Sequence, residues 1–128
     1  MATAGGFVYF FSGKMMPYHA QVIGKSWAEL DQGIQVIILA LMQAGGAAAI
    51  TSGLYGLVVL FIPLRRGERW ANWMLFLAAI FYGGLFFSVT FKVYLATNAS
   101  TPWPLGVIGM VLGLLGFLFS LGIEKEKN

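Results

Sequence analysis

The sequence predicts an all-α integral membrane protein with three transmembrane helices, preceded by a short N-terminal segment at the outer membrane interface. Of its 128 residues, 59% are hydrophobic and 10% are charged, whereas about 25% of the residues in an ordinary soluble domain are charged. A soluble fold of this length could not bury so much apolar surface. Three apolar stretches reach the length of about 20 residues with which a helix crosses the hydrocarbon core. We therefore expect a single membrane domain, residues 1–128, with transmembrane helices over 34–62, 71–96 and 104–123.

The composition also limits the chemistry. The chain has no cysteine, which excludes disulfides, thiolate catalysis and cysteine-ligated metal centres. It has a single histidine, and no aspartate or glutamate falls in an expected span, so a nucleophile with its base and orienting group cannot be assembled there. The net charge of +3 comes from basic residues that are scattered or flank the spans, which favours membrane orientation over nucleic-acid binding. We expect neither an enzyme nor a nucleic-acid partner.

The N-terminal residues 1–25 are expected to lie outside the membrane or in its outer interface. The stretch "GGFVYFF" is too short to cross, and an uninterrupted span through Lys14 is costly. Proline favours a first helical turn and glycine a helix end, so Pro17 and Gly24 predict a short helix over 17–23. The alternative is a four-helix transmembrane bundle, which requires residues 2–12 to form a half-span packed against the other helices.

The first long helix is expected to begin at Ser26, where "SWAE" forms a capping box: the serine accepts from the amide of Glu29, and the glutamate reaches back. Asp31 then lies near the first turn, where a carboxylate suits the positive helix end. The apolar sequence continues to Pro63, which ends the helix.

The short connection between the first two spans carries Arg65, Arg66 and Arg69. An excess of arginine in a short loop indicates the cytoplasmic side. We therefore place the 64–69 loop and the C-terminus in the cytoplasm, and the 97–103 connection and the N-terminus outside. Tryptophan at both membrane boundaries supports this topology: Trp70 and Trp73 inside, and Trp27 and Trp103 outside.

Small residues recur at helical spacing within the spans. Such rows let helix backbones approach closely in lipid, where the hydrophobic effect no longer drives association. We interpret them as helix-packing surfaces, and a path for substrate along the glycines is the alternative. The rows are Ala44, Ala48, Ser52 and Gly56, then Gly45, Ala49 and Gly53, and in the third span Gly106, Gly109, Gly113, Gly116 and Ser120.

Three polar residues are further candidates for a functional role. Gln35 and Gln43 are eight residues apart and share one helix face, where glutamine can bridge helices. Lys92 lies several residues before the outer end of the second span. Its long side chain can reach the interface, so anchoring is expected rather than transport.

His19, the single histidine, lies on the apolar face of the expected 17–23 helix. An imidazole with Met15 or Met16 beside it could bind haem or copper. The chain offers no second histidine, and no carboxylate lies nearby in helical register. We expect a hydrogen-bonded interfacial histidine, with cofactor binding as the alternative.

The stretches "MPYHAQVIG", "PLRRGERWANW" and "STPW", in this order, resemble a group of small bacterial membrane proteins of uncharacterised function. The resemblance covers most of the chain from residue 15 onward. It implies a multi-helix bundle in the bacterial inner membrane and no particular activity. Members of that group carry a fuller hydrophobic segment before the "MPYHA" stretch than "MATAGGFVYFFSGK" provides.

Together these features predict a non-catalytic accessory or structural subunit of a bacterial membrane complex, or a homo-oligomer. Its partners would be the lipid bilayer and other membrane subunits or copies of itself, and no cofactor besides lipid is expected. One alternative is a small oligomeric channel or transporter lined by Lys92, His19 and the glutamines. A third is a subunit that helps to hold a cofactor through His19.

Overall fold

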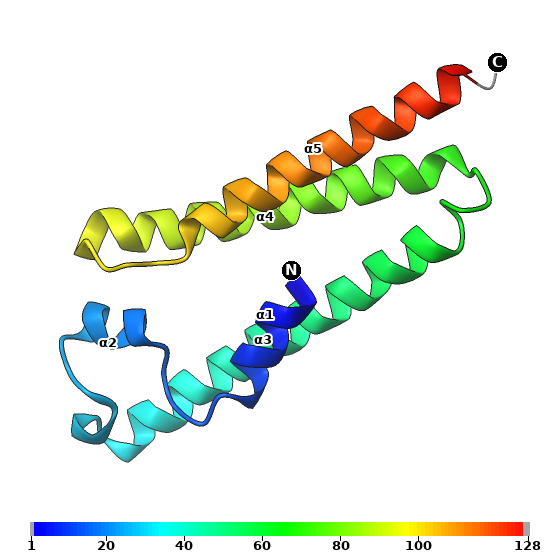
Figure 1. Ribbon diagram of the computed structural model, residues 1–128. Helices are drawn as coiled ribbons and strands as arrows, with labels where there is room; N and C mark the ends of the chain where they lie inside the picture. Colours follow the sequence, from blue (N-terminus) through cyan, green and yellow to red (C-terminus); the bar gives the residue numbers. More distant parts are fainter. Residues whose placement is uncertain (1, 127–128) are drawn as a thin grey trace. The chain divides into compact units, whose positions relative to one another are not determined.

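The computed structural model describes the backbone of residues 2–126, and within them it contains helices and no strand (Figure 1). The elements are α1 (Ala2–Phe11), α2 (Pro17–Ile23), the 3-10 helix η1 (Trp27–Glu29), α3 (Gln32–Phe61), α4 (Arg69–Thr97) and α5 (Trp103–Glu126). Three of these are long and apolar enough to cross a membrane: Gln32–Phe61, Arg69–Thr97 and Trp103–Leu121. The predicted all-α fold with three membrane-length helices is thus confirmed. The cytoplasmic placement predicted for the last residues, 127–128, lies outside the described residues.

The chain divides into two compact units. Unit 1 contains Met1–Tyr55 and Ala96–Ser100, and unit 2 contains Gly56–Leu95 and Thr101–Asn128. The boundaries fall inside α3 and α4, so each of these helices contributes to both units. The single membrane domain expected from the sequence stays a prediction beside this division.

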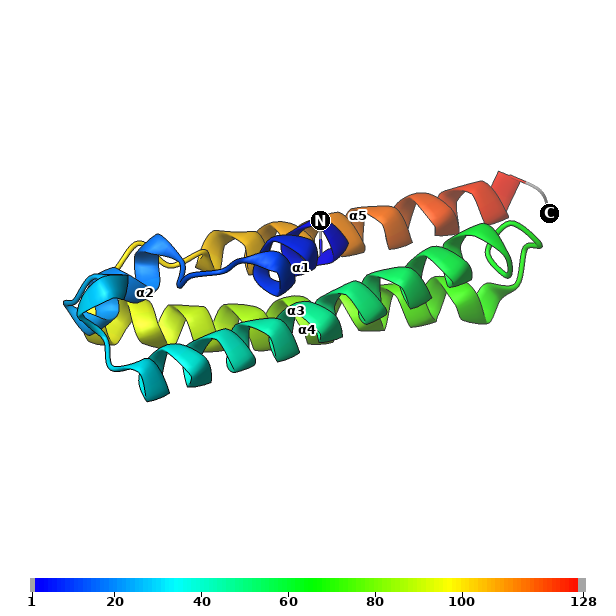
Figure 2. The ribbon, with the colours of Figure 1, turned by 90° about the horizontal axis from the view of Figure 1, so that it is seen from below.

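In unit 1, α1 packs against α3, as both Figure 1 and Figure 2 show. The two helices run antiparallel, because Thr3 contacts Gly53 while Phe10 contacts Gly46. Gly46 lies at the middle of the 30-residue α3. Residues 2–11 therefore form a helix beside the centre of a membrane-length helix. The expected place of this segment at the outer interface, and the half-span of the four-helix alternative, both stay predictions.

The predicted short helix over 17–23 is present as α2. It begins with Pro17, and Gly24 ends it in the left-handed conformation, with φ 71°. Met15, Leu30 and Met42 form a small buried core, against which Tyr9, Ala20 of α2 and other apolar side chains pack. This core joins α1, the following linker, η1 and α3.

The first long helix starts later than Ser26. The capping glutamate is in place, since Glu29 Oε2 accepts from the amide of Ser26 at 2.6 Å, but this pair caps η1 only. Leu30 then turns extended, with φ −86° and ψ 141°, and its side chain is buried in the small core. Burial of Leu30 thus separates the capped turn from α3, which begins at Gln32.

Unit 2 is an antiparallel pair of α4 and α5, joined through residues 98–102. Asn98 ends α4 with φ 54°, and asparagine tolerates this conformation better than most residues. At the start of α5, the Thr101 hydroxyl donates to the carbonyl of Thr90 at 2.9 Å. At the opposite end of the unit, a turn with Gly67 at φ 77° connects α3 to α4.

Candidate functional site

The contact between α1 and α3 depends on glycine. A Cβ placed on Gly6 would lie 2.8 Å from the carbonyl oxygen of Gly46, and one placed on Gly46 would lie 2.6 Å from the backbone nitrogen of Phe10. Real side chains do not approach backbone so closely. The side chain of Thr3 fills the space over Gly53 in the same way. We call this surface the α1–α3 contact.

The contact between α4 and α5 is built similarly. A Cβ on Gly106 would lie 2.8 Å from the carbonyl oxygen of Gly83 and 2.9 Å from the backbone nitrogen of Phe87. Gly113 meets Ala79 further along. Close backbone approach through small residues is the usual way in which helices associate in lipid. We call this surface the α4–α5 contact.

The predicted rows of small residues divide between these contacts and uncovered surface. Ala49 is 7% exposed on α3 near Gly46 and Gly53. The remaining members of the α3 rows face away: Ala44, Ala48 and Ser52 are exposed, and no neighbouring atom lies within 4 Å of a Cβ placed on Gly45 or Gly56.

On α5, Gly106 and Gly113 belong to the α4–α5 contact, whereas Gly109 and Gly116 have nothing within 4 Å of a Cβ position and Ser120 is half-buried. The row continues along one side of the helix, but only alternate members meet α4. The docking function predicted for the uncovered members stays a prediction.

Gly46 is not among the packing residues predicted from the sequence, and the structure places it in the α1–α3 contact. The buried positions of α3 are Met42, Gly46 and Ala49, and Gly53 continues them, with spacings of four, three and four residues. The signal was present in "MQAGGAAAITSG", but the four-residue rows beside it are equally regular. Only the partner helix α1 distinguishes Gly46 from its neighbour Gly45.

His19 caps its own helix. The amide of Met16 donates to His19 Nδ1 at 3.3 Å, and burial lowers the pKa of His19 below 6.5. A neutral ring that accepts at Nδ1 carries its proton on Nε2. The cofactor alternative at His19 stays a prediction. The ring packs edge-on against Tyr18, with ring centroids 4.1 Å apart.

Two contacts of α2 were not anticipated from the sequence. The hydroxyls of Tyr9 and Tyr18 form a hydrogen bond that ties α1 to α2. Burial and this hydrogen bond raise the pKa of Tyr18 above its usual value. Gln21 Oε1 accepts from the amide of Ser100 at 2.9 Å, which joins α2 to the chain after α4. The partners are 9 and 79 residues apart in sequence and lie in different elements, so the pattern of a single helix could not reveal the pairs.

The polar candidates within the helices have different surroundings. Gln35 Nε2 donates to the carbonyls of Trp27 at 2.8 Å and Leu30 at 3.1 Å, and so closes the turn before α3. Gln43 and Lys92 are exposed within the described chain. The structure therefore does not bring the two glutamines into one polar site, although they share a helix.

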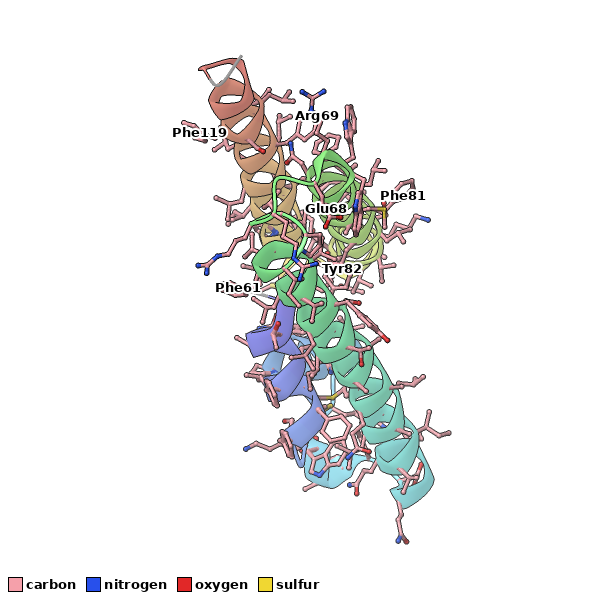
Figure 3. The ribbon with its side chains drawn as sticks, turned by 90° about the vertical axis from the view of Figure 1, so that its right-hand side faces the viewer. Phe61, Glu68, Arg69, Phe81, Tyr82 and Phe119 are labelled. Carbon is pink, nitrogen blue, oxygen red and sulfur yellow. The ribbon has the colours of Figure 1, made fainter. Side chains whose placement is uncertain are left out.

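The three arginines surround the turn between α3 and α4, and all are exposed. The Arg65 guanidinium carbon lies 5.1 Å from the centroid of the Phe61 ring, at the end of α3. Figure 3 shows Arg69 extending outward at the start of α4. The turn thus concentrates positive charge beside exposed apolar side chains.

No cluster of three or more histidine, cysteine, aspartate or glutamate side chains suited to a metal occurs among the described residues. No protein-family model matches this sequence, and no curated protein and no solved structure matches it either. The molecule is therefore defined by its fold: it is a helical membrane protein with three membrane-length helices.

Proposed function

We propose that this protein is a non-catalytic accessory or structural subunit of a membrane complex, or a homo-oligomer. The observation that carries the proposal is the division of its small residues. Contacts within each unit already involve four glycines: Gly6, Gly46, Gly83 and Gly106. By contrast, nothing lies within 4 Å of a Cβ placed on Gly109 or Gly116. Uncovered small residues offer a second helix a place to approach closely.

The apolar surface supports the same proposal. In the most apolar 18-residue stretches of the three long helices, only 17%, 11% and 6% of the residues are buried within the chain. The rest must be covered by lipid or by another protein, because water would solvate it poorly. A subunit that docks through one face and contacts lipid through the others meets this requirement.

The channel alternative needs polar groups that line a path. Several hydroxyls in the long helices are instead directed to their own backbone: Thr51 donates to the carbonyl of Ala47 at 2.8 Å, and Ser88 to that of Gly84 at 2.8 Å. Hydroxyls bonded in this way do not offer their protons to a substrate or an anion, since each has one proton to donate. The accessory role requires none of them.

The proposed location is the bacterial inner membrane, in keeping with the sequence resemblance. The arginine-bearing turn, residues 64–69, and the C-terminus would face the cytoplasm, with the N-terminus outside. Fusion of a periplasm-dependent and a cytoplasm-dependent reporter enzyme at residue 67 tests this orientation. Activity of the periplasmic reporter alone would contradict it.

Association is tested by purification in a mild detergent from native membranes, followed by mass measurement of the intact particle. Gly109→Leu/Gly116→Leu should convert the assembly to single chains without unfolding them. Gly33→Leu, another position with nothing within 4 Å, is the matched control and should leave the assembly intact. Gly106→Leu should instead disrupt the fold of unit 2.

Three outcomes contradict the proposal. They are an unsubstituted protein that occurs in no assembly, an assembly that Gly109→Leu/Gly116→Leu leaves unchanged, and an assembly that Gly33→Leu dissociates equally. In the last case the loss reports a general effect of leucine rather than docking at α5.

A further inference from the structure

We propose that the turn between α3 and α4 binds the phosphate of an anionic phospholipid through Arg65 and Arg66. Residues 65–69 contain three arginines against one glutamate. The side chains of Arg65 and Arg66 are exposed. Guanidinium groups match phosphate geometry and donate two parallel hydrogen bonds. The inference is independent of the docking role proposed above, because it concerns the end of unit 2 rather than the uncovered faces of the helices.

Phe61 positions the first of these charges. The Arg65 guanidinium carbon lies 5.1 Å from the Phe61 ring centroid, a separation at which a cation is attracted to the ring face. Phe61 is the last residue of α3 and is 53% exposed. The positive charge is therefore held directly beside apolar surface at the end of a membrane-length helix.

Glu68, the one carboxylate of the turn, accepts a hydrogen bond from Trp70. The Trp70 Nε1 atom donates to Glu68 Oε2 at 2.5 Å, which fixes the indole next to the turn; Figure 3 shows Glu68 there. The Trp70 and Trp73 side chains are 52% and 53% exposed. Tryptophan prefers the headgroup level of a bilayer, so these indoles indicate the depth at which a lipid phosphate would meet the arginines.

Three backbone amides of the turn are already paired. The amides of Arg66 and Glu68 each donate to the carbonyl of Pro63 at 3.1 Å. The amide of Gly67 donates to the carbonyl of Leu64 at 3.0 Å. These three amides are not available to a phosphate, and we assign its recognition to the side chains of Arg65 and Arg66. Guanidinium groups next to exposed Phe61 and Ile62 suit a ligand that joins a phosphate to acyl chains, which is an anionic phospholipid rather than inorganic phosphate.

Tryptophan quenching by brominated lipid tests the assignment. In a Trp27→Phe/Trp103→Phe background, the fluorescence comes from Trp70 and Trp73. The protein is reconstituted in phosphatidylcholine bilayers with an equal, small fraction of either dibrominated phosphatidylglycerol or dibrominated phosphatidylcholine. Phosphatidylglycerol should quench more strongly, and the difference should shrink in about 1 M salt, where charges are screened within about 3 Å.

The site itself is tested by paired substitutions of equal charge. Arg65→Gln/Arg66→Gln should lower the apparent affinity for phosphatidylglycerol about fivefold for each arginine removed. Lys14→Gln/Lys25→Gln removes two exposed charges from unit 1 and should have no effect. Arg65→Lys/Arg66→Lys keeps the charge but loses the paired guanidinium hydrogen bonds, so it should retain only part of the preference, between those of the unsubstituted protein and Arg65→Gln/Arg66→Gln.

Equal quenching by the two brominated lipids would overturn the proposal. So would a preference that survives Arg65→Gln/Arg66→Gln, or one that disappears equally in Lys14→Gln/Lys25→Gln, because net charge rather than the turn would then be responsible. Competition by inorganic phosphate at the same ionic strength would also overturn it, since the site would recognise the free anion rather than a lipid.

Discussion

Gly6 of α1 and Gly46 of α3 face each other where the backbones of the two helices approach closely. A Cβ placed on Gly6 would lie 2.8 Å from the carbonyl oxygen of Gly46, and a Cβ placed on Gly46 would lie 2.7 Å from that of Gly6. Each glycine is thus required by the backbone of the other. Replacing either glycine with a larger residue must push the two helices apart.

Gly46→Ala is expected to lower the free energy of unfolding by about 1–3 kcal/mol, because the added methyl group overpacks the α1–α3 contact. Gly45→Ala is the matched control: its Cβ has nothing within 4 Å, and alanine in a helix interior should stabilise by up to about 1 kcal/mol. Circular dichroism during titration with sodium dodecyl sulfate in mixed micelles measures both. Equal effects would show that α1 does not pack on α3.

Phe117 and Phe119 provide a second matched pair, in unit 2. The Phe117 ring centroid lies 4.6 Å from those of both Trp73 and Phe76, and the side chain is 9% exposed, whereas Phe119 is 73% exposed. Phe117→Ala should cost about 3–5 kcal/mol, the usual range for a buried phenylalanine. Phe119→Ala should cost far less, and only Phe117→Ala should alter the emission of Trp73. A reversed order would contradict the α4–α5 contact.

The sequence alone predicts the features of the fold that depend on residues close together in the chain. Apolar length predicts the three long helices, and the bracketing Pro17 and Gly24 predict α2, because a proline start and a left-handed glycine end act within a few residues. The expected start of the first long helix at Ser26 failed for a long-range reason. Leu30 is buried against Met15 and Met42, and that burial interrupts the helix.

The contacts between helices could be predicted only in part. α3 is apolar on every side, so no hydrophobic face indicates where a partner lies, and the small residues form several rows of similar regularity. Gly45 and Gly46 are adjacent in sequence, yet they point in directions about 100° apart on a helix. Which of them meets α1 is decided by a segment that is too short to be recognised as a span.

Cysteine accessibility should reveal the depth of α1. The chain has no cysteine, so Gly5→Cys and Gly13→Cys introduce single thiols, at positions where a Cβ has nothing within 4 Å. A membrane-impermeant maleimide, which needs a hydrated thiolate, should label Gly13→Cys in open membrane fragments and leave Gly5→Cys unlabelled until detergent is added. Rapid labelling of both would place residues 2–11 at the interface, as the sequence predicts.

His19 should make the stability of unit 1 depend on pH below about 6.5, the ordinary pKa of histidine. Burial lowers the pKa of His19 in the folded chain, so the unfolded state binds a proton first as the pH falls. Protonation therefore favours unfolding, and the stability present above pH 6.5 is lost progressively toward the lower folded pKa. The cation would also lose the hydrogen bond that Nδ1 accepts from the amide of Met16.

His19→Gln separates this titration from the capping role. Glutamine at the third helical position can still reach back to the N-terminal amide, but it does not titrate. We expect the two proteins to unfold alike above about pH 7 and the histidine form to be the less stable near about pH 5, in the same mixed-micelle titration. Glu29, whose pKa is lowered by its hydrogen bonds to Ser26, loses its charge at lower pH in both proteins and cancels in the comparison. Identical pH dependence would mean that the His19 side chain is exposed to water, because burial is what lowers its pKa.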